Sequence, residues 1–235
     1  MKNKKTKIMI VAAALATCLL VGGISAYFTD NETATNTFTI GKVDIELKEE
    51  FEEPEGVVPG QEIDKKPWIE NVGKNTVYVF MEVVMPYKNM VTANEDGTKN
   101  EAADTEIFQM LDKDGNVGIN EGWIQVGTAD KAESEDEPGT GTVTYVYAYA
   151  ADDAMTALPV YDDENENDIK GVTPTLFDKV KFVNAVEGQG LEESTQNIVV
   201  NAYGIQATEL GDNVSPGNVW TIIQNQMAKA EDDGE

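Results

Sequence analysis

The sequence contains no histidine and no arginine, and it has a single cysteine, Cys18. Without histidine the chain cannot form a Ser-His-Asp or Cys-His catalytic group, or an HExxH zinc site. Without arginine it lacks the planar side chain that binds phosphate or carboxylate through two parallel hydrogen bonds. Together these absences exclude most hydrolytic, zinc-dependent and phosphate-binding sites.

Positive charge is also scarce. The 17 basic residues are all lysine and are outnumbered by 43 acidic residues, which gives a formal net charge of −26 at pH 7. A chain this negative repels nucleic acids and anionic lipid headgroups, so we expect no nucleic-acid partner. The functions that stay open are assembly or binding through a surface, cation binding, and catalysis by carboxylates. With 235 residues the chain is long enough to build one hydrophobic core without disulfides.

The N-terminus has the parts of a secretory signal peptide. A lysine-rich start precedes a mostly apolar stretch from Ile8 to Ile24, and small residues precede the predicted cleavage site between Ala26 and Tyr27. Cleavage there would remove four lysines and the only cysteine, and we expect contact with a membrane only in the precursor. The predicted organisation is residues 1–26 as signal peptide, 27–230 as a single domain and 231–235 as an acidic tail.

Two alternatives to this cleavage stay open. The first alternative is an uncleaved membrane anchor. The length of the apolar stretch counts against it, because a span needs about 20 residues and this stretch is slightly shorter. The second is lipidation of Cys18, because Leu15-Ala16-Thr17-Cys18 loosely resembles a lipoprotein motif. The threonine before the cysteine and the apolar residues after it depart from that motif.

Short apolar or alternating segments dominate the rest of the chain and predict β-strands. Thr37–Leu47 alternates but shifts phase at Gly41-Lys42, which indicates a bulge or a tight bend. Thr76–Met85 is apolar on both faces apart from Glu82, so we expect a central strand. Further strands are expected from Trp68-Ile69 and at Glu106–Leu111, Trp123–Gly127, Thr142–Ala150, Val180–Asn184 and Ile198–Thr208.

One of these segments carries an aromatic stripe. Alternate positions hold Val143, Tyr145, Tyr147 and Tyr149, which would share one face of a strand. We interpret the stripe as a core face or a cross-strand aromatic ladder. The alternative is a surface on which sugar rings stack.

One helix is predicted near the C-terminus. Ser215 is a good N-cap, and Pro216 would occupy the first helical position. Apolar residues then recur at helical spacing, and we expect Trp220 to pack against a sheet. The stripe consists of Val219, Trp220, Ile223 and Met227.

The order of elements predicts the fold class. Acidic, glycine-bearing loops separate the strands at residues 93–105, 129–141 and 161–171. Eight to ten short strands with turn signals favour an all-β fold. We predict an antiparallel, jelly-roll-type β-sandwich with long acidic loops and a short C-terminal helix.

Calcium is the one ion that the sequence suggests, and no other cofactor is expected. The candidate ligands are Asp112, Asp114, Asn116, Asp162, Asp163 and Glu164. The first three begin a loop similar to that of an EF-hand, but Val117 stands where the loop needs glycine and Trp123 replaces the final glutamate. The alternative is a hairpin turn centred on Gly115. The other three belong to an acidic loop that is either a weak calcium site or only solvated.

Segments at both ends of the chain resemble one family. The predicted signal peptide runs into Ala26-Tyr27-Phe28-Thr29-Asp30, and a segment of the N-x-F-x-x-G-x-[VL]-D-[LI] kind follows at Asn36–Ile45. The Pro59-Gly60 turn, the strand ending in Trp68–Gly73 and the last strand, Val200–Gln206, fit the same pattern. In these segments the chain resembles the TasA/camelysin family of secreted Gram-positive bacterial proteins.

The resemblance implies a jelly-roll fold, processing by a dedicated signal peptidase, and a role in the extracellular matrix or at the cell surface. That role would be a biofilm-matrix fibre subunit or a camelysin-like metallopeptidase, and the missing histidines count against the peptidase. A calcium-binding adhesion module is a further alternative.

Assembly through the N-terminus has a physical mechanism. Cleavage would free a strand-prone segment that includes Tyr27, Phe28, Phe38 and Ile40. Such a segment can add to a sheet edge of a neighbouring copy or of a homologous matrix subunit, and head-to-tail repetition gives a filament. The alternative is that the segment pairs within its own domain.

Overall fold

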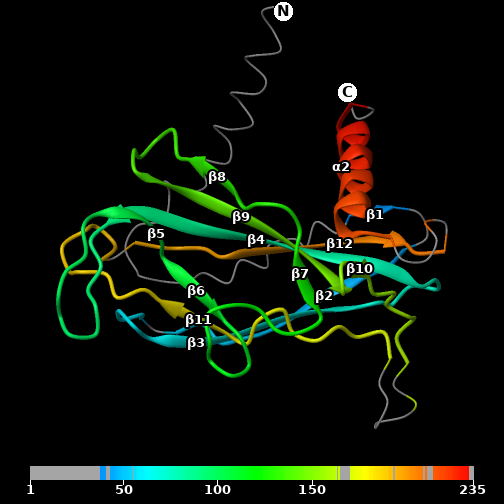
Figure 1. Ribbon diagram of the computed structural model, residues 1–235, viewed down its shortest axis with the longest axis horizontal. Helices are drawn as coiled ribbons and strands as arrows, with labels where there is room; N and C mark the ends of the chain where they lie inside the picture. Colours follow the sequence, from blue (N-terminus) through cyan, green and yellow to red (C-terminus); the bar gives the residue numbers. More distant parts are fainter. Residues whose placement is uncertain are drawn as a thin grey trace, which may run out of the picture.

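A computed structural model shows two β-sheets packed face to face and one helix (Figure 1). It describes residues 38–40, 43–54, 56–162, 164, 170–192, 194–208, 210 and 214–232. The large sheet contains β1 (Phe38–Ile40), β4 (Val77–Met90), β5 (Ala103–Glu106), β7 (Trp123–Gln125), β8 (Asp130–Glu133), β9 (Thr140–Ala151), β10 (Ala154–Met155) and β12 (Val199–Gln206). The small sheet contains β2 (Glu46–Phe51), β3 (Glu62–Glu70), β6 (Phe108–Leu111) and β11 (Lys179–Phe182). The helix is α2 (Pro216–Asp232).

The strand order follows from long-range pairing around β4. The large sheet runs β1-β12-β4-β9-β10, with β5 on β4 and with β7 and β8 on β9, and the small sheet runs β2-β3-β11-β6. All pairs of described strands are antiparallel except β1 with β12. The prediction of an all-β sandwich is confirmed, and so is the central strand expected at Thr76–Met85, which is β4.

One apolar core fills the space between the sheets. It combines Met81 on β4 and Tyr147 on β9 with Ile69 on β3, Phe108 on β6 and Val180 on β11, all of them buried. Because side chains alternate across a strand, the odd-numbered positions of residues 77–85 in β4 point into this core, and the even-numbered positions point to the opposite face. The aromatic stripe on β9 is therefore a core face, as expected.

The helix α2 covers the outer face of the large sheet. Val219 and Ile223 are fully buried in a second apolar cluster. The Trp220 ring lies 5.4 Å from the Phe80 ring and 5.3 Å from the Tyr203 ring, centroid to centroid. The predicted helix and the packing of Trp220 against a sheet are both confirmed. Figure 1 shows the C-terminal end of α2 pointing away from the sandwich.

Two expectations about strands need correction. The segment expected as one interrupted strand, Thr37–Leu47, contributes to both sheets, because β1 joins the large sheet and β2 joins the small one. Its phase shift at Gly41-Lys42 lies outside the described residues. The acidic loop expected at 129–141 contains a strand, β8, which pairs with Gly141–Thr144 of β9 although all its side chains are exposed.

Asn71 holds the turn between β3 and β4. Its side chain is fully buried and its Nδ2 donates to the carbonyls of Asn75 at 2.9 Å, Leu158 at 3.1 Å and Pro159 at 2.9 Å. Its Oδ1 accepts the backbone N–H of Gly73 at 3.1 Å. A side chain with this many bonds fixes the loop, since leaving its partners unpaired would be costly.

None of the helices formed by the described residues has the length and apolar character needed to cross a membrane.

Candidate functional site

The first candidate site is the edge of the large sheet at β1. β1 pairs in parallel with β12, and its register places Phe38 opposite Tyr203 and Ile40 opposite Ile205. Because β1 is terminal in the strand order, no described strand pairs with its outer side. An unpaired strand edge can accept a further strand from another chain.

β1 is paired differently from the other strands of the large sheet. Its described pairing with β12 covers Phe38–Ile40 and is parallel, whereas β12 pairs with β4 in antiparallel fashion from Val199 to Gln206. Parallel pairing is also slightly less stable per residue than antiparallel pairing. β1 is therefore joined to the large sheet by the weaker kind of pairing per residue.

The predicted assembly residues divide between described and undescribed parts of the chain. Phe38 and Ile40 lie in β1, at the sheet edge. Tyr27 and Phe28 lie outside the described residues, as does the predicted cleavage site after Ala26.

The second candidate is a groove with a volume of ≈ 500 Å³, which we call the Phe108 groove. Its walls come from the β2–β3 connection, β6, β11 and the segment 184–196. The rings of Phe108 and Phe182 line it, with 5.7 Å between their centroids. Sequence analysis did not identify this groove, because its walls come from segments far apart in the chain.

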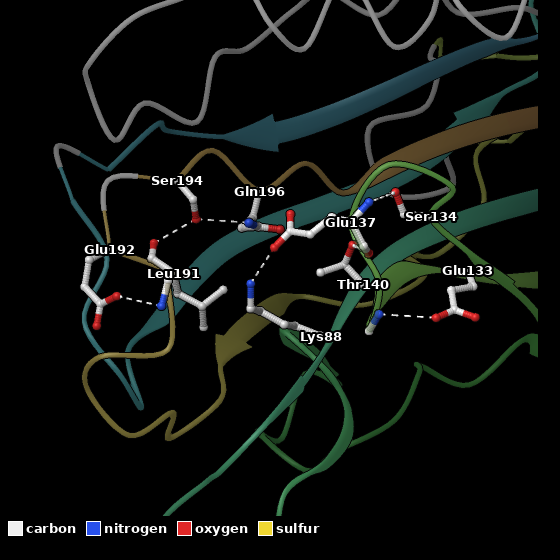
Figure 2. Close-up of polar contacts among 11 residues, drawn as sticks. Lys88, Glu133, Ser134, Glu137, Thr140, Leu191, Glu192, Ser194 and Gln196 are labelled. Atoms are coloured by element: carbon white, nitrogen blue, oxygen red, sulfur yellow. Dashed lines mark hydrogen bonds and ion pairs between the residues drawn. The ribbon is translucent and has the colours of Figure 1, made fainter.

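Polar groups at the rim of the Phe108 groove are engaged with one another (Figure 2). The Ser194 hydroxyl donates to the Leu191 carbonyl at 2.7 Å and accepts from Gln196 Nε2 at 3.0 Å. Glu192 accepts the backbone N–H groups of Gly188 at 2.5 Å and Gly190 at 3.0 Å. The Gly188 bond in particular lowers the pKa of the Glu192 carboxyl.

Ser194 is not arranged as a catalytic nucleophile. A serine nucleophile needs an adjacent base, and Ser194 donates to a carbonyl instead. Figure 2 also shows Lys88 of β4 beside this segment, where its Nζ lies 2.9 Å from Glu137 Oε1 in the β8–β9 connection. The lysine therefore ties β4 to the β8–β9 connection and is not a free cation in the groove.

A family model described as camelysin metallo-endopeptidase matches residues 1–122, about half of the chain. The chain belongs to the camelysin metallo-endopeptidase family. The match spans β1 to β6 and includes the Pro59-Gly60 turn and the Trp68–Gly73 segment, both of which showed the resemblance in the sequence. No curated protein and no solved structure matches the chain.

The donor set of this camelysin-family chain does not fit a zinc peptidase. Zinc sites of peptidases combine histidine, cysteine and carboxylate ligands, but the chain has no histidine and its only cysteine is Cys18. Within the described ranges, no group of three or more Cys, Asp or Glu side chains is placed to hold a metal ion. The oxygen donors that the chain does have suit calcium or magnesium better than zinc.

The first predicted calcium loop is a hairpin turn. Asp112 Oδ1 accepts the backbone N–H groups of Asp114 at 2.9 Å and Asn116 at 2.8 Å, and the Asn116 bond is the main reason that the pKa of Asp112 is lowered. Gly115 has a φ of 83°, which suits glycine in a tight turn. These bonds close the turn without an ion, and calcium binding by this camelysin-family member stays a prediction.

The second predicted calcium loop is described only in part. The Asp162 carboxylate accepts the backbone N–H of Glu164 at 3.0 Å. The backbones of Asp162 and Lys170 pair in an isolated antiparallel β-bridge. Asp163 lies outside the described residues. This loop, too, stays a predicted calcium site.

Proposed function

We propose that this camelysin-family protein is a secreted structural subunit that assembles into filaments of the extracellular matrix through its N-terminal segment. The observation that carries the proposal is the pairing of β1 at the edge of the large sheet. β1 is parallel to β12, and it follows directly in the chain on the segment whose N-terminus signal-peptide cleavage would free. A strand from a second copy could replace it on β12 with the same backbone hydrogen bonds.

The length of the N-terminal segment is compatible with exchange between copies. Residues 27–37 separate the predicted cleavage site from β1, and an extended chain of this length reaches about 36–40 Å. That reach exceeds the spacing between strands of one sheet, about 4.8 Å, several times over. After cleavage these residues lie on the free side of β1 and could extend strand pairing onto a neighbouring copy, while residues 41–45 keep β1 tethered to β2.

The charge of the chain favours specific over unspecific contact. Without residues 1–26 the chain has 13 lysines and 43 acidic residues, and the resulting net charge of −30 opposes the approach of two copies and keeps monomers soluble. Association then depends on directional backbone pairing at one edge. Screening by salt weakens the repulsion, so we expect faster assembly at higher ionic strength.

A deletion tests the proposal. The purified chain without residues 1–26 should form filaments visible by electron microscopy, and the same chain without residues 27–40, which lacks β1, should not. A matched control removes residues 233–235, which lie at the opposite terminus and should leave assembly intact. Unchanged filament formation after the N-terminal deletion would refute the proposal.

The alternative function is the peptidase activity in the family name. The absence of histidine from the whole chain counts against a zinc mechanism. We expect no cleavage of a protein substrate such as casein by highly purified protein, with or without added zinc. Cleavage that a chelator abolishes and zinc restores would favour the peptidase.

A further inference from the structure

A second hollow, which we call the tyrosine groove, lies beside β9 and has a volume of ≈ 480 Å³. Tyr145 and Tyr147 line it, and their rings are nearly parallel, with 14° between the planes and 6.1 Å between the centroids. Glu106, Gln109 and Gln125 add a carboxylate and two amides to the same lining. Aromatic faces beside a few polar groups are typical of small-ligand sites of this size.

The groove exists because strand pairing along β9 is interrupted. β8 pairs with Gly141–Thr144 and β7 pairs with Tyr147–Tyr149, which leaves Tyr145 without a strand partner on that side. Figure 1 shows β8 and β7 at opposite ends of β9. On the other side the chain crosses from the large sheet to the small one directly after Glu106, where Ile107 is buried.

The polar groups of the groove are only partly used within the chain. The Tyr145 hydroxyl donates to Glu106 Oε1 and thereby holds this carboxylate against the aromatic pair. Tyr147 lines the groove and is only 4% exposed, and the hydrogen bonds among the described residues do not include its hydroxyl. Among the described residues Gln226 Oε1 is the buried side-chain atom that lacks a partner, so the Tyr147 hydroxyl is accessible from the groove and available to a ligand with hydrogen-bonding groups.

The rim adds an exposed apolar side chain. Val117 is 69% exposed and belongs to the hairpin turn that follows β6. Asp104, also at the rim, forms an ion pair with Lys131, which in turn lies over the Tyr87 ring at 4.1 Å from its centroid. The charge of Asp104 is thus balanced locally, and Glu106 is the acidic group that faces a ligand.

We propose that the tyrosine groove binds a segment of a neutral polysaccharide. A sugar ring has an apolar C–H face that can lie on Tyr145 and hydroxyl groups around it that can donate to Glu106 and exchange hydrogen bonds with Gln109 and Gln125. The Tyr147 hydroxyl completes the set of partners. A matrix protein with such a site would attach its filaments to the carbohydrate around them, although the site itself does not depend on filament formation.

Other ligand classes fit less well. Anionic ligands, including acidic polysaccharides and phosphates, would face Glu106 without any arginine in the chain to bind them. A peptide that added as a strand would need a longer free edge than the single interruption at Tyr145 provides. A purely apolar ligand would leave the Glu106 carboxylate and the amides unpaired.

Calorimetric titration of the purified protein tests the proposal with defined probes. Glucose and N-acetylglucosamine hexamers are the neutral probes, a galacturonate hexamer is the anionic one, and a decalysine peptide represents a cationic peptide. We expect at least one of the two neutral hexamers to bind, and we expect neither the galacturonate hexamer nor the decalysine peptide to bind. Tyr145→Ala and Glu106→Gln should each weaken binding about tenfold or more, as expected when a stacking face or a charged hydrogen-bond partner is lost.

Two further variants keep the test decisive if Tyr145→Ala perturbs the fold. Gln109→Ala changes an exposed side chain, and Tyr147→Phe removes only the hydroxyl; both should weaken binding of the neutral hexamer. Tyr161→Ala is the matched control, because Tyr161 is exposed but does not line the groove, and it should leave binding unchanged. Binding of no neutral probe, preference for galacturonate or decalysine, or equal affinity in all variants would overturn the proposal.

Discussion

At the centre of the large sheet β4 pairs with β9 in antiparallel fashion from Phe80 to Lys88, whereas at the edge the described residues of β1, Phe38–Ile40, pair with β12 in parallel. The centre is also covered on both faces, by the core between the sheets and by the first turns of α2. The stability of the fold therefore depends mainly on β4 and β9 at the centre of the large sheet. In the proposed assembly, the edge is the part of the sheet that changes partners.

The largest effect should follow a change at the centre. Phe80 is fully buried and contacts Trp220, so Phe80→Ala should lower the free energy of unfolding by about 3–5 kcal/mol. Urea denaturation followed by circular dichroism measures the loss. Phe51→Ala is the matched control, since Phe51 lies half-buried in the edge strand β2. Equal losses in the two variants would contradict the importance of the centre.

A smaller effect is expected on β12, which lies between the centre and the edge. A Cβ atom at Gly204 would lie 3.0 Å from Val43 Cγ1 and 3.1 Å from Ile45 Cδ1. Gly204→Ala should therefore destabilise the protein by about 1–3 kcal/mol through overpacking. Gly217→Ala in α2 is the control, because open space surrounds that position, and it should not destabilise the protein. A neutral effect of Gly204→Ala would show that β12 is free to shift.

Tyr203 of β12 should make the folded state less stable at alkaline pH. Burial, followed by the nearby Glu82 carboxylate, raises the pKa of Tyr203 above its ordinary value. The folded state therefore keeps this tyrosine neutral, while the unfolded state ionises it above about pH 10, so stability falls as the pH rises through that range. Denaturation at pH 8 and pH 11 should show a smaller loss for Tyr203→Phe than for the unaltered protein. Identical losses would mean that another group causes the loss of stability.

The smallest effect on stability is expected at the edge. Thr39→Pro removes a backbone donor from β1, and because one edge hydrogen bond is at stake the free energy of unfolding should fall by about 1 kcal/mol or less. The same variant should nevertheless impair filament formation, because the exchanged strand would pair poorly. A loss of stability as large as that of Phe80→Ala would place β1 in the core of the fold.

The sequence carries strong signals where apolar side chains repeat. Thr76–Met85 and the stripe that includes Trp220 predict β4 and α2 because burial sets their pattern. β8 could not be predicted in this way, since Asp130–Glu133 has no apolar face and its pairing depends on backbone bonds to β9. The tyrosine groove was equally hidden: the stripe on β9 predicts a core face, and only the gap between β7 and β8 opens part of it.

The central claim is that β1 must leave its own sheet for assembly, and a reversible disulfide tests it most directly. Ile40 and Ile205 are register partners, and neighbouring strands about 4.8 Å apart lie within the range that a disulfide can bridge. Without residues 1–26 the chain has no other cysteine, so Ile40→Cys with Ile205→Cys would lock β1 onto its own β12. We predict no filaments from the oxidised protein and filaments after reduction, as seen by electron microscopy. Equal filament formation in the two states would contradict strand exchange.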